Sequence, residues 1–307
     1  MTFTPQTLTL PLLALLVLAG CGNKQDQSVE VSRAAVAASA ESPTAAVASN
    51  IRNLRENNFK ALVEASVPPQ YLPQFRAEWQ AKLDAKPITD ADRAEFKADM
   101  ERLTAPDAEQ KLWAELEPQM DKFRKEAAMQ MPMMVGIGRG ILVSALQQSE
   151  DLSEDQKQQA VKGVDAFAHW METAPFTDAA LAQKSIGVLC NTARALKLES
   201  LDQVRAMDFD QMLEKAGVAA AGLKQIFDIY GFSVDRALDS ARTELVSNEG
   251  NQARVKVGYS LFDSTLDFES ELELFEGRWY DRNSLNKMRE KAASGDQAAA
   301  PVETDQD

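Results

Sequence analysis

The sequence predicts an α+β protein with a mainly α-helical body and a small C-terminal four-stranded antiparallel sheet. Apolar residues recur at helical spacing through segment 49–232, and residue pairs typical of helix N-termini recur along the same segment. After Gly231 the apolar period changes to two, which is typical of half-buried strands. We therefore expect a helical region over residues 49–232 and an antiparallel β region over residues 233–291.

The first residues resemble the signal of a bacterial lipoprotein. Residues 8–19 form an apolar run made almost entirely of Leu, Ala and Val, which has the length of a signal-peptide core and is too short to span a bilayer. The residues Leu18–Gly20 match the lipobox, and Cys21 matches its cysteine. The resemblance implies that residues 1–20 are a removable signal peptide, that Cys21 carries acyl chains such as palmitate, and that the lipid bilayer is a partner.

The residues after the cysteine indicate which membrane the protein would reach. Gly22 stands where an aspartate would alter sorting, and the resemblance implies the outer membrane, facing the periplasm, with the inner membrane as the alternative. Residues 21–48 are small and polar without an aromatic side chain, so we expect a flexible tether. Residues 292–307 are similar and acidic, and we expect a disordered tail. Other envelope proteins are the further partners that this location offers.

Several helices can be placed inside the helical region. Apolar residues between Val47 and Ser66 fall on one side of a helical wheel, and the sequence VPPQY after them should end the helix. Further along, a Ser or Thr is followed three residues later by Asp or Gln, as at a capped helix N-terminus. The four pairs are Thr89 with Asp92, Thr104 with Asp107, Ser153 with Gln156 and Ser200 with Gln203.

The longest apolar stripe stays within about a third of a helical wheel. It consists of Leu112, Leu116, Met120, Phe123, Ala127, Met131, Met134, Ile141 and Ala145. Pro118 and Pro132 should bend or interrupt this helix. Beyond Pro132 the sequence MMVGIGRGILVSAL is apolar on every side, so we expect residues 133–146 to be the central, fully buried element. Its three glycines should be matched by close approach of another backbone or by a break, and Arg139 needs a carboxylate or carbonyl partner.

The β region contains two alternating segments, residues 252–262 and 266–274. A two-residue turn at Asp263–Ser264 sets the register between them. It would pair Leu261 with Leu266, Tyr259 with Phe268, Val255 with Leu272, Lys256 with Glu271 and Arg254 with Glu273. A loop at Asn248–Gly250 and a turn at Glu276–Gly277 add one strand on each side. They would bring Leu245 opposite Ala253 and Leu274 opposite Trp279.

The end of this region resembles a known kind of domain. The segment LELFEGRWYD, residues 272–281, is similar to the last hairpin of cystatin-like and nuclear-transport-factor-like domains of exported lipoproteins. The resemblance implies a sheet that curls around a helix and forms a pocket. Tyr259, Phe268 and Trp279 would line that pocket, and binding of an apolar small molecule is therefore one alternative function.

Composition excludes several classes of protein. The net charge of -14, without a basic cluster, argues against nucleic-acid binding. The two cysteines, Cys21 and Cys190, offer no disulfide framework, and the apolar neighbours of Cys190 indicate a small buried thiol. His169 is the only histidine, so a multi-histidine zinc site is impossible, and the adjacent Phe167 and Trp170 favour a structural role for it.

The sequence MQMPMM contains four methionines that resemble the spaced thioethers of periplasmic copper(I)-handling proteins. They are Met129, Met131, Met133 and Met134. Methionines on a buried stripe also fill irregular cores, and we favour this interpretation. We accordingly expect neither a metal nor another cofactor.

A row of carboxylates alternates with the apolar residues of one predicted strand. The row comprises Asp267, Glu269, Glu271 and Glu273. Repelling carboxylates can share protons or hold calcium, so a carboxylate-dependent hydrolase is the second alternative function. We favour a solvated outer face with cationic partners. The sequence as a whole favours a membrane-anchored lipoprotein that faces the periplasm and has a non-catalytic role in binding or envelope maintenance.

Overall fold

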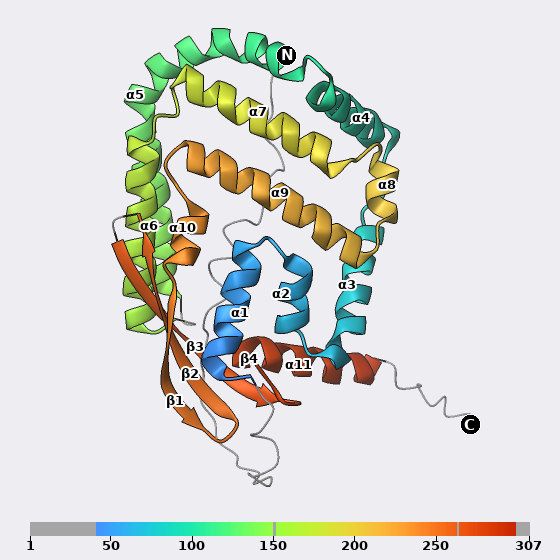
Figure 1. Ribbon diagram of the computed structural model, residues 1–307, viewed down its shortest axis with the longest axis vertical. Helices are drawn as coiled ribbons and strands as arrows, with labels where there is room; N and C mark the ends of the chain where they lie inside the picture. Colours follow the sequence, from blue (N-terminus) through green and yellow to red (C-terminus); the bar gives the residue numbers. More distant parts are fainter. Residues whose placement is uncertain (1–40, 150–151, 263, 299–307) are drawn as a thin grey trace, which may run out of the picture.

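A computed structural model describes residues 41–149, 152–262 and 264–298 (Figure 1). Over these residues the predicted fold class is confirmed, since the chain is mostly helical and carries a C-terminal four-stranded antiparallel sheet. The helices are α1 (Pro43–Arg55), α2 (Phe59–Ser66), α3 (Leu72–Asp84), α4 (Asp90–Thr104), α5 (Ala108–Gln148), α6 (Glu154–Thr173), α7 (Ala179–Leu196), α8 (Leu201–Ala206), α9 (Phe209–Ile229), α10 (Val234–Asp239) and α11 (Arg282–Ala298), with a 3₁₀ helix at Pro69–Tyr71. The strands are β1 (Arg242–Glu249), β2 (Gln252–Leu261), β3 (Ser264–Phe275) and β4 (Arg278–Asp281).

The first helix starts inside the segment assigned to the tether. The Ser42 side chain accepts a hydrogen bond of 3.2 Å from the backbone N–H of Ala45, and Pro43 occupies the first helical position. The single helix predicted between Val47 and Ser66 is divided at Asn57, whose φ of 57° is left-handed and cannot continue a helix. α2 ends before the two prolines, as the VPPQY sequence predicts.

Two predicted capping boxes are confirmed, at the pairs Thr89–Asp92 of α4 and Ser153–Gln156 of α6. At α8 the hydroxyl of Ser200 accepts from the backbone of Gln203, as expected. The side chain of Gln203 instead accepts from the N–H of Glu199, so this cap is not reciprocal.

The capping prediction at Thr104 is wrong. Thr104 is still the last residue of α4, where its hydroxyl donates a 2.7 Å hydrogen bond to the carbonyl of Met100. Asp107 precedes α5 without a side-chain capping bond. A reciprocal box that the sequence analysis missed is formed by Asp208 and Gln211 at the start of α9.

The long helix α5 runs for 41 residues and is sharply bent. Its two parts, residues 108–126 and 130–148, are inclined at 74° to each other. The bend predicted at Pro132 is therefore confirmed, because this ring supplies no N–H to the carbonyl four residues earlier and crowds that turn. The helix continues through Pro118. In Figure 1, α5 forms the outer boundary along the top and left of the molecule.

The prediction that residues 133–146 form the central, fully buried element is wrong. Met133, Met134 and Ile141 are 62%, 63% and 65% exposed. One side of this half of α5 packs on the neighbouring α6, and no described element covers the opposite side. A helix that is apolar on every side is expected to contact other apolar groups. Its composition does not show whether those groups belong to the same chain.

The helical body is a stack in which α7 packs between α5 and α9, and α2 packs on the far side of α9 (Figure 1). α7 and α9 approach closely at Gly222, where an added Cβ would lie 2.1 Å from the hydroxyl of Thr192. Cys190 is fully buried beside Ala108 and Ile186, which confirms the buried-thiol interpretation. Burial raises the pKa of this thiol and keeps it protonated.

A bidentate ion pair ties α7 to the start of α5. The guanidinium of Arg194 contacts both carboxylate oxygens of Glu109, at 2.5 and 3.0 Å, and also donates to the carbonyl of Ala105 at 2.8 Å. The hydrogen bond from Arg194 lowers the pKa of Glu109 from 4.5 to about 2. One side chain of α7 thereby holds the corner between α4 and α5 in place.

The strand order β1-β2-β3-β4 is an antiparallel meander, as predicted. The register between β2 and β3 differs from the prediction by two residues, because Leu261 pairs with Ser264 rather than with Leu266. Phe262 leaves β2 with a left-handed φ of 53°. A shift of two residues keeps every side chain on its predicted face, so the buried set is unchanged although the partners differ.

Of the two outer strands, β1 repeats this two-residue shift and β4 does not. Leu245 pairs with Val255 rather than Ala253, and a bulge follows Leu245. The predicted pair of Leu274 with Trp279 is confirmed. Its turn consists of Glu276 and Gly277, with φ values of 49° and 80°, as a two-residue hairpin turn requires.

The inner face of the sheet packs against α1. Its buried residues are Ala253, Val255, Val257, Leu272 and Trp279. They contact Ala46, Val47 and Ile51 of α1. α11 covers the edge at β3 and β4 and continues to Ala298, so helix occupies the first part of the segment 292–307 assigned to a disordered tail. The predicted β region also includes α10 and the start of α11.

We expect Gly222→Ala to destabilise the protein by about 1–3 kcal/mol, because the new methyl group overpacks the contact with Thr192. Gly187→Ala in α7 is the matched control, since nothing lies within 4 Å of its Cβ position and the change should be neutral or stabilising. Denaturant unfolding measures both. A second change, Thr192→Ala, should restore part of the loss in the double variant, and equal losses for both glycine variants would contradict the close-packing argument.

We expect stability to fall between about pH 4.5 and pH 2 in a way that depends on Glu109. The pKa of Glu109 is lower in the folded protein than in the unfolded chain, so ionised Glu109 stabilises the native state at pH values above its unfolded-state pKa. This contribution is lost as the pH falls toward the folded-state pKa of about 2. Glu109→Gln should lose that component of the pH dependence in denaturant unfolding. Glu117→Gln on the same helix is the control, because its exposed carboxylate has no ion pair among the described residues. Identical profiles for the two variants would refute the assignment.

Candidate functional site

Most of the predicted site residues are not brought together. Cys21 lies outside the described residues, and the side chain of Met129 is likewise not described. Met131 is half-buried, whereas Met133 and Met134 are exposed, so the core-filling interpretation is wrong for these last two. Among the described residues, no group of three or more His, Cys, Asp or Glu side chains could hold a metal ion.

The three aromatic residues predicted to line a pocket are packed on the inner face of the sheet. Trp279 is 7% exposed and belongs to the core cluster, which Phe268 also contacts. Tyr259 meets Phe268 edge to face, with ring centroids 6.2 Å apart. Burial raises the pKa of Tyr259, as expected for a phenol surrounded by apolar atoms.

The carboxylates along β3 each have their own cation, as the favoured interpretation expected. The pairs are Asp267 with Lys256 at 3.4 Å, Glu269 with Arg254 at 3.4 Å, Glu271 with Arg282 at 3.2 Å and Glu273 with Arg289 at 2.8 Å. The register places Lys256 opposite Glu269 and Arg254 opposite Glu271, and each of the two cations contacts the carboxylate two residues earlier on β3, so the partners differ from the predicted ones. Separate partners give four salt bridges rather than a pair of carboxylates that share a proton.

Two shallow surface pockets are described. The first, about 440 Å³, is lined by Trp79 and Phe209 and by Asp210, which is already paired with Arg76 and Lys60. The second, about 300 Å³, lies between α6 and the β2–β3 turn and is lined by Lys162, Asp165, Ala166, His169, Phe262 and Ser264. His169 is exposed there, so the structural role predicted for it is not seen. The adjacent Trp170 is buried instead, and its ring packs against Phe176 and Phe227. The indole N–H of Trp170 donates a hydrogen bond of 2.8 Å to the carbonyl of Tyr230.

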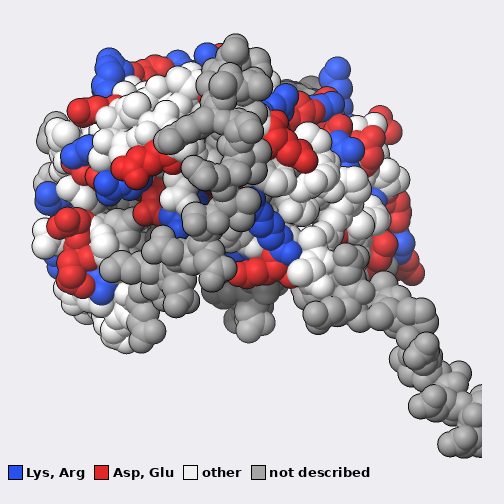
Figure 2. All heavy atoms as spheres, turned by 90° about the horizontal axis from the view of Figure 1, so that it is seen from below, with Lys and Arg blue, Asp and Glu red and all other residues white. Residues whose placement is uncertain are grey.

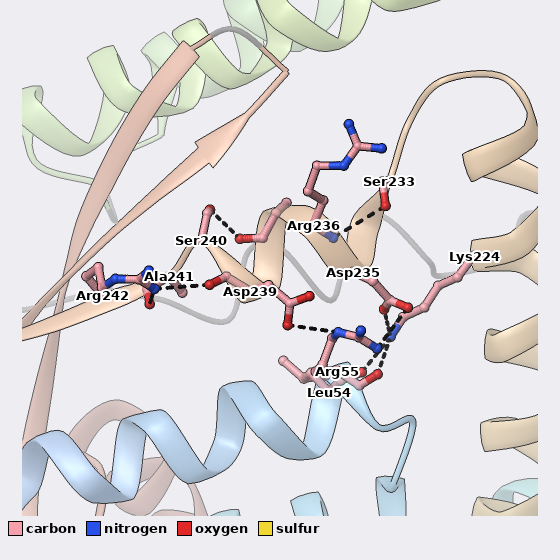
Figure 3. Close-up of polar contacts among 11 residues, drawn as sticks. Leu54, Arg55, Lys224, Ser233, Asp235, Arg236, Asp239, Ser240, Ala241 and Arg242 are labelled. Carbon is pink, nitrogen blue, oxygen red and sulfur yellow. Dashed lines mark hydrogen bonds and ion pairs between the residues drawn. The ribbon is translucent and has the colours of Figure 1, made fainter.

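A charged network joins α1, α9 and α10 (Figure 3). The ammonium of Lys224 donates to the carbonyls of Leu54 and Arg55, at 2.7 and 3.1 Å, and lies 2.9 Å from Asp235. Arg55 contacts Asp235 at 3.0 Å and Asp239 at 2.9 Å. Lys224 is only 15% exposed, and its ammonium meets two backbone carbonyls and one carboxylate, so the network is a structural joint.

The most unusual surface lies on the second half of α5. We call it the α5 outer face, and it consists of Gln130, Met133, Gly136, Ile137, Gly140, Ile141, Ser144 and Gln147, all of which are exposed. None of these residues is charged, although the solvent side of a helix normally carries charges. By contrast, charged side chains of both signs are interspersed over the surface seen in Figure 2.

Arg139 is the one charged residue between Gln130 and Gln148. Its guanidinium lies 2.6 Å from the carboxylate of Asp165 on α6, so the predicted carboxylate partner is confirmed. The pair sits beside the α5 outer face rather than within it, because Arg139 points toward α6. The face is therefore uncharged over its whole length.

The glycines of this helix have no neighbour. At Gly136, Gly138 and Gly140 no atom lies within 4 Å of the position that a Cβ would occupy, and α5 is continuous through them. The expected close backbone approach is therefore not made by the described chain. Each glycine disfavours a helix by about 1 kcal/mol relative to alanine, and nothing within the described fold offsets this cost.

Two further findings bear on the site. Among the described residues no single helix is long and apolar enough to cross a membrane, and only the two halves of α5 taken together, inclined at 74°, have the length and composition of a span. Comparison of the chain with protein-family models, curated proteins and solved structures found no match. The resemblances noted in the sequence therefore stay predictions.

We expect Lys224→Met to destabilise the protein by about 1–3 kcal/mol, because two carbonyls lose a charged donor and Asp235 loses one of its two cations. Denaturant unfolding is the measurement. Lys184→Met on the exposed side of α7 serves as the control and should leave stability within about 0.5 kcal/mol of the original chain. Equal effects of both changes would show that Lys224 is not a structural joint.

Proposed function

We propose that the protein is a lipid-anchored lipoprotein that faces the periplasm and acts without catalysis, by binding through the α5 outer face. The observation that carries the binding role is the exposure of Met133, Ile137 and Ile141, at 57–65%, on this uncharged helix surface. Contiguous exposed apolar surface of this kind marks a site of interaction in soluble proteins.

The way in which charged groups are partnered supports a binding role over a catalytic one. Catalytic carboxylates are kept in environments that push their pKa values apart. The four carboxylates of β3 instead form separate ion pairs, and Asp165 near His169 is paired with Arg139. These groups are neutralised structurally rather than poised for proton transfer.

The proposed location in the cell envelope rests on the lipobox resemblance at Leu18–Cys21. The chain from Cys21 to the start of α1 at Pro43 comprises 22 residue steps and could extend over at most about 75 Å. A body attached in this way can turn any of its faces toward a partner in the same membrane. Anchoring would also raise the local concentration of partners.

We expect mass spectrometry of the protein from its native envelope to identify an N-terminal peptide that begins at Cys21 and carries acyl mass. Cys21→Ala should move the protein from the membrane fraction to the soluble fraction, whereas Cys190→Ala should leave it in the membrane fraction. An N-terminal peptide without acyl mass, or a Cys21→Ala variant that stays membrane-bound, would overturn the proposed anchor.

A further inference from the structure

We infer that the α5 outer face docks on the lipid bilayer, with the second half of α5 lying in the plane of the membrane at the boundary between headgroups and acyl chains. The inference rests on the proposed function, because it names the partner of that face as the membrane that holds the anchor. It is drawn from the charge of the face, the shape of α5, its glycines and the length of the tether.

The charge of the face suits an apolar layer. Arg139 is the one charged residue on the second half of α5, and its guanidinium is directed to α6, where Asp165 neutralises it. On the other side of the helix, Met133, Ile137 and Ile141 are 57–65% exposed. The chain carries a net charge of -14, so anionic lipids repel it wherever acidic groups face them. The α5 outer face brings no such group to the membrane.

The shape of this half of α5 favours a lipid surface over a folded partner. Neither of the two surface pockets described above is lined by a residue of α5, so neither offers a partner's side chain a place on this helix. Fluid acyl chains adapt to a convex helix, whereas a folded protein needs a matching groove. α6 packs on the opposite side, and the 74° bend carries the first half of α5 away, over the helical stack (Figure 1). The second half can therefore lie in the membrane plane without crossing it.

The glycines of this half point to lipid independently of its charge. Gly136, Gly138 and Gly140 disfavour a helix in water, and nothing lies within 4 Å of their Cβ positions. Lipid offers no water to replace a broken backbone hydrogen bond, so a helix that contacts acyl chains is held more strongly than the same helix in water. Glycine and proline are accordingly more frequent in membrane helices than in soluble ones. Docking would stabilise the part of α5 whose sequence is weakest as a helix in water.

The tether keeps the face near the membrane. With acyl chains at Cys21, the 22 residue steps to Pro43 hold the start of α1 within about 75 Å of the lipid. Docking therefore needs little affinity of its own, because the effective concentration of lipid around the anchored body is high. One helix face without the anchor should bind vesicles only weakly.

The experiment places an environment-sensitive fluorophore on the full acylated chain in vesicles of phosphatidylethanolamine and phosphatidylglycerol. An introduced cysteine is then the reactive thiol, since Cys21 is acylated and Cys190 is fully buried. We expect the fluorophore at Ile137→Cys to emit at shorter wavelength and to be quenched by lipids with a nitroxide on the acyl chain. Gln119→Cys, an exposed uncharged position before the bend of α5, is the matched control and should show neither change.

Charge variants and lipid composition complete the test. Ile141→Glu in the Ile137→Cys background should abolish the quenching, whereas Gln119→Glu in the same background should leave it intact. In the unanchored Cys21→Ala chain with excess vesicles, Ile141→Glu should weaken binding about tenfold, because one isoleucine is no longer buried in lipid. Binding of that chain should strengthen as the fraction of phosphatidylglycerol falls or salt rises, which is opposite to the behaviour of a basic surface helix.

Three results would overturn the inference. Absence of quenching at Ile137→Cys, in protein whose Cys21 carries acyl mass, leaves the anchor intact and refutes the docking. A shift to shorter wavelength without quenching by the nitroxide lipid indicates that a protein covers the face. Equal quenching at Gln119→Cys indicates contact that is not specific to the face. Absence of acyl mass at Cys21 refutes the anchor instead, and the docking is then decided by the vesicle binding of the Cys21→Ala chain.

Discussion

The joint between α1, α9 and α10, on which the C-terminal sheet is mounted, is organised by one largely buried ammonium group. Lys224 reaches from α9 to the last carbonyls of α1 and to Asp235 of α10. α1 supplies the apolar side chains that fill the inner face of the sheet, and α10 leads directly into β1. A few charged hydrogen bonds at the C-terminus of α1 thus help to set the orientation of the sheet relative to the helical stack. Hydrogen bonds are directional, whereas apolar packing is not.

The helical stack is organised differently, by close packing of neighbouring helix backbones. α7 and α9 meet where Gly222 faces Thr192, and α5 is held against α7 by Arg194 and Glu109. The bend near Pro132 then carries the rest of α5 out of the stack and along α6. The bend therefore explains why the most apolar stretch of the body lies at its boundary: the part of α5 before the bend lies on the core, and the part after it does not.

The sequence predicted those features that depend on local chemistry. Period-two alternation identified β2 and β3 and their buried faces, the turn at Glu276 and Gly277 was placed correctly, and two reciprocal caps were recognised. Register was missed by two residues because such a shift keeps every side chain on its face. The α5 outer face was missed for another reason. The pattern of apolar residues indicates how apolar the second half of α5 is. Which side of this helix remains exposed to solvent depends on where α6 packs in the folded protein.

The bulge in β1 has a consequence for how this molecule avoids unwanted assembly. β1 is the free edge of the sheet, and beside the bulge Leu245 and Val246 are exposed. A regular edge with such side chains would offer hydrogen-bonding groups to a strand of a neighbouring chain and invite aggregation. The irregular step in the backbone interrupts that template, while α11 covers the opposite edge at β4. Polymerisation through strand addition is thereby discouraged at both ends of the sheet.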